Sequence, residues 1–530
     1  MGDLGVSAAD VADIVTRPRS GSDPCVVFNM SAQDIEDIVN PRVQKWSQAD
    51  AATREKALEI YPPPKAMQSL KYLYRIGLGP SSSHTMGPRR AALRFLRRNP
   101  ECRAYKVTLY GALAATGKGH MTDKAIIGGL QGEGASLNRD VSVSMEWKPA
   151  TFLSYHPNAM KFLALDREGK VVDEYLCFSV GGGALVDANT EGGPLNSAAA
   201  GIYEVYPFPR FNDIVSLCMT EGVSMPDIVF KYDTDIRPHL EHVWQTMQES
   251  MAEGLRREDP LVLTDDMTYP RKAARFYRRS RTMPPSRRRT SLVNAYAHAV
   301  SEQNASANVV VTAPTCGSCG VLPAVLVYLK DELGLSDCDI INAIAVAGLV
   351  GNVAKANSSI SGAEVGCQGE VGVATSMAAA AAAYLMGGGP QQIETAAESA
   401  LEHQLGLICD PVHGKVIVPC IERNGHAALR ALDCADLALM GEGNHLVSYD
   451  ECVHSMKLSG LDMHSRYKET SEGGLALTFD MDQRVLEDKL RRQKQDDMVA
   501  ERREIIREIA HSLRHKQGTR TPPTPHPQGQ

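Results

Sequence analysis

The feature that most constrains the fold is a long stretch, from Ser291 to about Asp480, that is rich in alanine, glycine and leucine and has almost no strand pattern. Apolar residues recur there at the spacing of helices that bury one face. The pattern is clearest in five segments: Asn294 to Glu302, Ile340 to Val353, Gly369 to Met386, Ile393 to Leu405 and Ile421 to Met440. Residues 291–480 are therefore predicted to form an all-helical domain of catalytic size.

The longest small-apolar run, Val371 to Met386, is mostly alanine and contains Thr375 and Ser376. It falls short of the roughly 18 to 20 apolar residues that a membrane span needs. We therefore expect a buried helix and no membrane partner. The N-terminus has an acidic start, no basic region and no uninterrupted apolar stretch. It predicts neither a secretory signal nor a transit peptide, so a cytoplasmic protein is expected.

The preceding residues, 67–210, mix the two kinds of pattern. Strand-like runs cover Tyr105–Tyr110, Lys161–Asp166 and Val171–Val180, and a helical stretch covers Arg89–Arg98. The turn Asp166–Gly169 between two of the runs predicts a hairpin. The predicted fold class is therefore an α+β N-terminal domain followed by an all-α helical catalytic domain.

Three further segments complete the predicted organisation. Residues 1–66 are predicted to be an N-terminal extension, and residues 481–530 a charged helix followed by a disordered tail. Residues 211–290 connect the two domains, with helical patterning from Asp227 to Glu253 and a basic run from Arg271 to Arg289. The formal net charge is −7 and no nucleic-acid-binding module surrounds the basic run, so we expect a small-molecule ligand and no nucleic-acid partner.

Twelve cysteines are scattered over the chain, which is not a disulfide framework in a reducing compartment. Three of them, Cys367, Cys409 and Cys420, stand in turns bordered by glycine or proline. A packing role remains open for each one alone. A zinc site that uses Cys316 and Cys319 also remains open, although structural zinc prefers four ligands in close pairs. Three cysteines on a [4Fe–4S] cluster would leave one iron free to act as a Lewis acid on a hydroxyl.

A hydroxyl-rich loop forms the second informative pattern. Ser81, Ser82, Ser83, His84 and Thr85 come directly before an amphipathic helical stretch. Hydroxyls and N–H groups at a helix start can hold an anion, although a simple helix cap explains the serines equally well. The glycine-rich turn Thr116–His120 lacks the spacing of a phosphate-binding loop.

Together these motifs resemble, in order over residues 68–478, the bacterial-type iron–sulfur L-serine dehydratases. The matching motifs are Gly79–Thr85, Thr116–His120, His156–Asn158, Gly181–Gly183, Thr312–Thr315, Ser361–Glu370 and Asp410–Asn424. The resemblance implies conversion of L-serine to pyruvate and ammonia with a [4Fe–4S] cluster and without pyridoxal phosphate. It implies Cys367, Cys409 and Cys420 as the cluster ligands. It also implies substrate contacts from Ser81, Ser82, Ser83, Thr85, Asn158 and Thr315. We also expect a homodimer.

The chain departs from the family pattern in three places. Many members have Thr-Asn-Gly where Thr315-Cys316-Gly317 stands, and many have a cysteine at the position of Thr375. Some members end in a cysteine that reaches back to the cluster, but no cysteine follows Cys452 here. We therefore expect the fourth iron to carry water at rest.

His84 is predicted to be an acid/base group, because the ordinary pKa of histidine, about 6.5, suits proton transfer near neutrality. A role only in binding the substrate carboxylate or in ordering the loop remains open. Two other functions also remain open: a related lyase acting on L-cysteine, and a non-enzymatic cluster sensor that binds nucleic acid through Arg271–Arg289.

Overall fold

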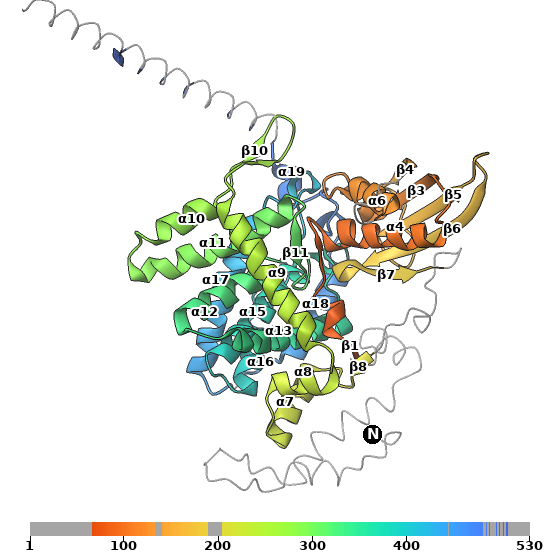
Figure 1. Ribbon diagram of the computed structural model, residues 1–530. Helices are drawn as coiled ribbons and strands as arrows, with labels where there is room; N and C mark the ends of the chain where they lie inside the picture. The colour runs from red at the N-terminus through yellow and green to blue at the C-terminus, as the bar shows by residue number, and fades with distance from the viewer. Residues whose placement is uncertain are drawn as a thin grey trace, which may run out of the picture. The chain divides into compact units, whose positions relative to one another are not determined.

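A computed structural model describes residues 66–132, 140–188, 204–443 and 445–480, together with seven helical residues between 484 and 506. The predicted N-terminal extension, apart from Ala66, and the predicted tail from Gly518 lie outside the described residues. Contacts join the described residues from Ala66 onward into one compact unit. Its described part consists of a sheet region followed by a helical region, as the fold class predicted (Figure 1).

The sheet region contains one mixed sheet with the strand order β4-β3-β5-β6-β7. Strands β3 and β4 are parallel, and the other neighbouring strands are antiparallel. Helices α4 and α6 pack against each other and cover one face of the sheet (Figure 1). The elements are α4 (Gly87–Arg98), β3 (Ala104–Tyr110), α5 (Gly111–Ala115), α6 (Thr122–Gln131), β4 (Ser142–Lys148), β5 (Ala159–Leu165), β6 (Val171–Val180) and β7 (Ala184–Asp187).

The two faces of this sheet differ because side chains alternate along each strand. In β3, Tyr105, Val107 and Leu109 are buried in the core beneath the helices. Lys106 lies on the other face, where it pairs with Glu146 at 3.4 Å. One face therefore packs against the core and the other meets water, which is common in antiparallel and mixed sheets.

The predicted hairpin is confirmed. Strand β5 pairs antiparallel with β6, and the connecting turn has Gly169 at φ +82°. The carboxylate of Asp166 accepts hydrogen bonds from the backbone N–H groups of Glu168 (2.9 Å) and Lys170 (2.8 Å). This local side-chain bonding is why aspartate opens such turns.

Helix α15 lies at the centre of the helical region and packs against α12, α13, α16 and α17. Every side chain from Val371 to Ala383 is buried, so the predicted buried helix is confirmed. Alanine at these contacts lets neighbouring helices approach closely. The helices are α7 (Phe211–Glu221), α8 (Met225–Tyr232), α9 (Arg237–Arg256), α10 (Ala273–Ser280), α11 (Pro285–Ala305), α12 (Val321–Leu333), α13 (Asp337–Asn357), α14 (Gly362–Val365), α15 (Val371–Leu385), α16 (Pro390–Glu402), α17 (Cys420–Met440), α18 (Tyr449–Asp462) and α19 (Leu475–Thr478).

Helix α13 is long and apolar enough to span a membrane by length and composition, with a mean hydropathy of 1.4 in its most apolar window. However, 78% of that window is buried inside the protein, and α13 packs along α15. The core of a helical protein accounts for its apolar character.

The helical pattern from Asp227 to Glu253 corresponds to two helices, α8 and α9, rather than to one. The break falls at Asp233, whose buried carboxylate accepts hydrogen bonds from Ser69 Oγ (2.7 Å) and the backbone N–H of Leu70 (3.0 Å). Those partners lie more than 160 positions away in the sequence. A contact of this range leaves no local sequence pattern.

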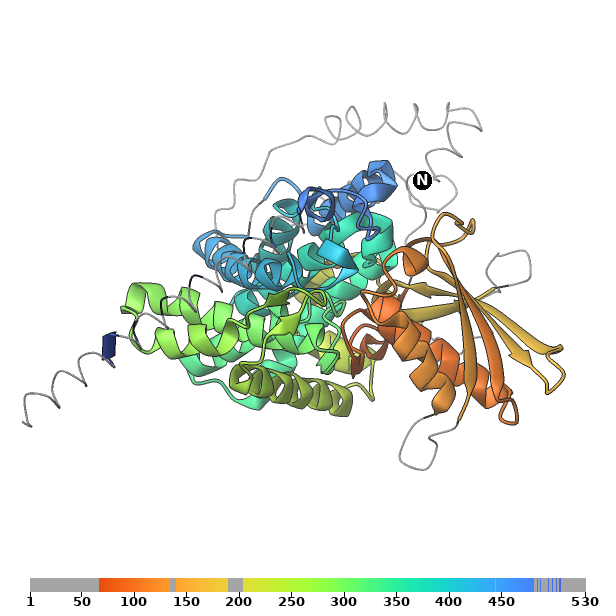
Figure 2. The same ribbon diagram turned by 90° about the horizontal axis from the view of Figure 1, so that it is seen from above.

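Short strand pairs join the two regions. β2 (Ile76–Leu78) pairs antiparallel with β11 (Val309–Val311), and β1 (Met67–Gln68) pairs with β8 (Glu204–Tyr206). A third pair, β9 (Leu261–Val262) with β10 (Thr268–Tyr269), lies before α10. β11 falls inside the stretch predicted to be all-helical. The pairing of β11 with β2 places the segment that follows β2 beside the helical region (Figure 2). This segment contains Ser81–Thr85, called the serine-rich loop below.

Candidate active site

The serine-rich loop forms one helical turn, Ser82–Met86, that runs directly into α4. The hydroxyl of Ser81 accepts a hydrogen bond from the backbone N–H of His84 at 3.1 Å. Thr85 Oγ1 donates to the carbonyl oxygen of His120 at 2.7 Å. From the helical region, Asn304 Nδ2 donates to the carbonyl oxygen of Pro80 at 2.8 Å. The loop is therefore held from both sides.

His84 is fully buried in this turn. Its Nε2 lies 3.1 Å from the carbonyl oxygen of Ala112, and because a carbonyl only accepts, Nε2 carries the hydrogen. Nδ1 is then the basic nitrogen of the ring. It lies 2.9 Å from Ser83 Oγ and 3.2 Å from Oε1 of Glu469. Burial lowers the pKa of His84 to about 4, so the ring is neutral at physiological pH.

The three predicted ligand cysteines come from separate segments. Cys367 lies in a short turn, Gly366–Gln368, before α15, and Cys420 is the first residue of α17. Cys409 follows α16, and its backbone N–H donates to the carbonyl oxygen of Tyr467 at 2.9 Å. All three line one cavity, together with Ser81, His120, Gly317, Glu370, Val371, Asp410, Pro411, Val416, Arg423, Glu469 and Pro80.

Burial dominates the electrostatics of the thiols. It raises the pKa of Cys367 to about 11, and it raises the pKa values of Cys409 and Cys420 above their ordinary range. The guanidinium of Arg423 opposes this shift at Cys367 and Cys420. Arg423 is itself fixed by Asp410, at 2.8 Å between Nη2 and Oδ1. Burial therefore favours the protonated form of the three thiols.

Besides Asp410, two glutamate carboxyl groups line this cavity. Glu370 lies 3.8 Å from Cys409 Sγ, and burial raises its pKa to about 7. Burial also raises the pKa of Glu469 well above its ordinary value. Oε2 of Glu469 is buried and has no hydrogen-bond partner among the described residues. Glu469 lines the cavity, whereas its neighbour His84 does not.

The distances between possible ligand atoms distinguish a site for one metal ion from a site for a cluster of several ions. Thiolates bound to one zinc ion lie about 3.8 Å apart, because each Zn–S bond is about 2.3 Å. Within the described part of the chain, only His84, His120 and Glu469 bring three ligand atoms within 4.8 Å of one another. The three cysteines line one cavity without converging on a single ion. A multi-iron cluster, in which each cysteine binds a different iron, suits this arrangement.

Apart from Ser81, the residues predicted to contact the substrate do not line the cavity. Ser83 bonds His84, and Thr85 bonds the backbone of His120. Thr315 is buried and hydrogen-bonds Glu370. Ser82, Thr85, Asn158 and Thr315 are buried but are not among the residues that line the cavity. Both polar atoms of the Asn158 side chain lack a hydrogen-bond partner among the described residues.

Several cavity residues were not singled out from the sequence as site residues, among them His120, Glu370, Arg423 and Glu469. Three of these four lie within motifs that the resemblance uses, so reading those motifs in full would have found them. Glu469 lies outside every such motif. It reaches the cavity because its backbone N–H donates to the carbonyl oxygen of Cys409 at 3.0 Å, across 60 positions of sequence. No spacing pattern in the sequence predicts that contact.

Comparison with known proteins identifies the family. The model of the serine dehydratase alpha chain matches residues 96–476. The chain is 40% identical to an L-serine dehydratase of Streptomyces coelicolor over 448 residues, which cover 77% of this chain and 98% of that protein. It is 38% identical to L-serine dehydratases of Haemophilus influenzae and of Escherichia coli (L-serine dehydratase 2), covering 78% of this chain and 99% of each. The chain therefore belongs to the serine dehydratase family.

Proposed function

We propose that the chain is an L-serine dehydratase that converts L-serine to pyruvate and ammonia with a [4Fe–4S] cluster on Cys367, Cys409 and Cys420. One observation carries the proposal. Three cysteines from three distant segments line one cavity, which Ser81 of the serine-rich loop also lines. The names of the similar proteins support serine as the substrate.

The donor set fits the cluster. A cationic metal group would stabilise thiolates that burial otherwise disfavours, and Arg423 adds positive charge beside two of them. Cys420, at the first position of the 21-residue helix α17, also faces the positive end of the helix dipole. When bound by three cysteines, the cluster would supply one iron that can polarise the β-hydroxyl of serine as a Lewis acid.

The serine-rich loop would bind the substrate carboxylate. Ser81 lines the cavity, and the turn that follows it runs into the N-terminus of α4, where N–H groups attract anions. Holding the carboxylate here would place Cα between the loop and the cysteine wall. The chain would thereby position a very small substrate at both ends.

The paired side chains of His84 and Glu469 would remove the α-proton. Because Nε2 of His84 is held by Ala112, the proton of the pair lies between Nδ1 of His84 and Oε1 of Glu469. Burial favours this proton on Glu469 at rest, because it lowers the pKa of His84 and raises that of Glu469. Transfer of the proton to Nδ1 of His84 would leave Glu469 as a carboxylate on the cavity wall. We therefore assign removal of the proton from Cα to Glu469. His84, which does not line the cavity, would accept the proton of Glu469.

Loss of the α-proton and of hydroxide yields aminoacrylate and water. Aminoacrylate tautomerises to an imine, and the imine hydrolyses to pyruvate and ammonia without a further protein group. A sensor that binds nucleic acid is less well supported. In the basic segment, Arg289 is paired with Asp433 and Asp436, and Lys272 is paired with Glu422, which leaves less free positive charge for phosphates.

The test is an anaerobic assay of the full chain after cluster reconstitution, with L-serine and L-cysteine offered separately and pyruvate measured. We expect turnover of serine, and none from Cys409→Ser prepared in the same way. No pyruvate from serine at full iron content would refute the proposal. Faster turnover of cysteine would identify the related lyase instead.

A further inference from the structure

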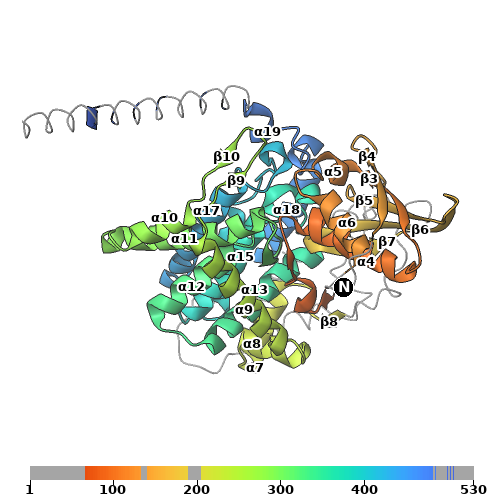
Figure 3. The same ribbon diagram turned by 45° about the horizontal axis from the view of Figure 1, so that its top comes forward.

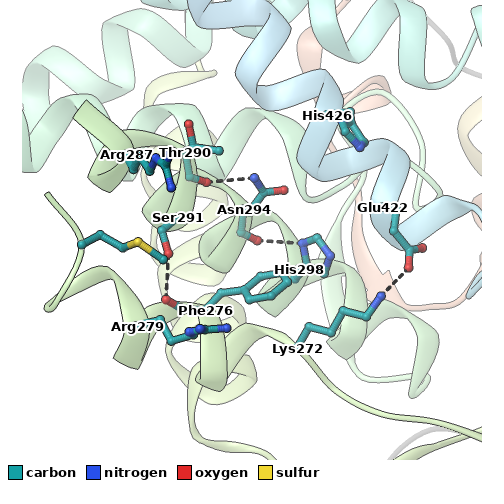
Figure 4. Close-up of a pocket in the computed structure, with 11 residues that line it drawn as sticks. Lys272, Phe276, Arg279, Arg287, Thr290, Ser291, Asn294, His298, Glu422 and His426 are labelled. Carbon is teal, nitrogen blue, oxygen red and sulfur yellow. Dashed lines mark hydrogen bonds and ion pairs between the residues drawn. The ribbon is translucent and has the colours of Figure 1, made fainter. Parts of the chain in front are cut away.

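A second cavity lies between α10, α11 and the start of α17, away from the cysteines. Its volume is about 610 Å³, within the range of small-molecule binding pockets. Figure 4 shows its lining side chains, with the rings of Phe276 and His298 side by side at its centre. Helices α10 and α11 lie side by side and project from the helical region (Figure 3).

The floor of this pocket is uncharged. His298 is buried, and its Nδ1 donates to the carbonyl oxygen of Asn294 at 2.8 Å. Burial lowers the pKa of His298 to about 4, so the ring is neutral at physiological pH. The ring packs edge-on against Phe276, with 5.1 Å between centroids, and Met283 adds a further apolar wall. Such a floor suits an aromatic or aliphatic body.

The rim, in contrast, is cationic. Arg279 on α10 and Arg287 on α11 line the pocket and are exposed. Neither has an acidic partner within the described residues, whereas the neighbouring Arg278 pairs with Glu258 and Arg289 pairs with two aspartates. Long stems that line an apolar wall while the charged heads stay in water are typical of arginine.

One end of the pocket is lined by the helix turn that begins at Cys420. Lys272 Nζ lies 2.7 Å from Oε1 of Glu422, and both residues line the pocket. Glu422 is two residues after Cys420, on the first turn of α17. A molecule in the pocket would therefore touch the helix turn that carries one of the proposed cluster ligands.

We propose that this pocket binds an organic anion with an aromatic or aliphatic body. The body lies on Phe276 and His298, and the negative group is met by the cationic rim of Arg279 and Arg287. Charge complementarity favours an anion over a neutral or cationic molecule, because the lining contains three cationic side chains and one carboxylate. This inference does not depend on the proposed activity.

Isothermal titration of the anaerobically purified full chain with 8-anilinonaphthalene-1-sulfonate, an aromatic anion, tests the proposal. We expect one saturable site per chain and a Kd about tenfold higher in Arg279→Ala/Arg287→Ala. The matched control is Arg281→Ala/Arg288→Ala. It removes the same charge from the same segment, but these two side chains line a separate small pocket with Tyr277 and Tyr296. Its Kd should change less than about twofold.

Equal weakening in both double variants, no weakening in either, or the absence of a saturable site would overturn the proposal. A Kd that rises with protein concentration would do the same, because it would identify a second copy of the chain as the occupant. Ser291→Trp provides an independent check, since an indole at this lining position fills the pocket. It should abolish binding while thermal unfolding stays cooperative, and retained binding would contradict the assignment.

Discussion

The sheet region and the helical region contribute different chemistry to the same cavity. The loop before α4 brings Ser81 to the cavity wall and holds the buried imidazole of His84 behind that wall. The helical region brings three thiols, three carboxyl groups and one guanidinium. The proposed cluster depends only on the helical side, whereas the proposed removal of the α-proton would need both regions. Cluster retention and turnover should therefore be separable by substitution.

The largest effect is expected on the helical side. Cys409→Ser should remove the cluster and all turnover, because the remaining two cysteines cannot hold it. Iron and sulfide content, with the visible absorbance, would measure this. Cys434→Ser is the matched control: Cys434 is also buried, but it lies 3.8 Å from Ser399 in the packing between α16 and α17. An intact cluster in Cys409→Ser would contradict the assignment of the cluster to the cysteines of the helical region.

A second substitution tests the pair that spans both regions. Glu469→Gln keeps the size of the side chain but removes the carboxylate, so kcat should fall at least about 100-fold with iron content unchanged. The kinetic isotope effect with α-deuterated serine should increase as proton removal becomes limiting. Glu472→Gln, at an exposed position three residues later, should behave like the parent. Unchanged kcat in Glu469→Gln would return the search for the base to His84.

A smaller effect is expected at the loop. Ser81→Ala removes the hydroxyl that accepts from the backbone of His84 and faces the cavity. If the loop binds the substrate carboxylate, KM should rise about tenfold while kcat and iron content change little. A fall in kcat with unchanged KM would show that Ser81 contributes to the chemical step instead.

The smallest effect is expected on the outer face of the sheet. Lys161→Ala removes a half-exposed ion pair with Glu174 at 2.7 Å, and the free energy of unfolding should change by less than about 1 kcal/mol. Phe162→Ala, the next residue in β5 and fully buried, should cost about 3 to 5 kcal/mol. Chemical denaturation of the two variants would measure the difference. Similar costs would mean that the two faces are not distinct.

The sequence predicts what depends on local pattern. Helix α15 follows from its run of alanine, the β5–β6 hairpin from Asp166 and Gly169, and the family from motifs that keep their order. The sequence does not predict what depends on distant partners. The break between α8 and α9 requires Ser69 and Leu70, strand β11 requires β2, and Glu469 enters the cavity through Cys409. The roles of the predicted site residues, His84 and the cysteines included, remain predictions.

The pairing of β2 with β11 also has a consequence for biosynthesis. Gly77 pairs with Val310, so the strand that fixes the serine-rich loop gains its partner only after more than 200 further residues have been added. At about 5 to 20 residues per second, this interval lasts roughly 10 to 50 seconds. Strands β3 to β7, whose partners lie within residues 104–187, complete their sheet during that time. During synthesis, the sheet can therefore form before the serine-rich loop and the helical region come together around the cavity.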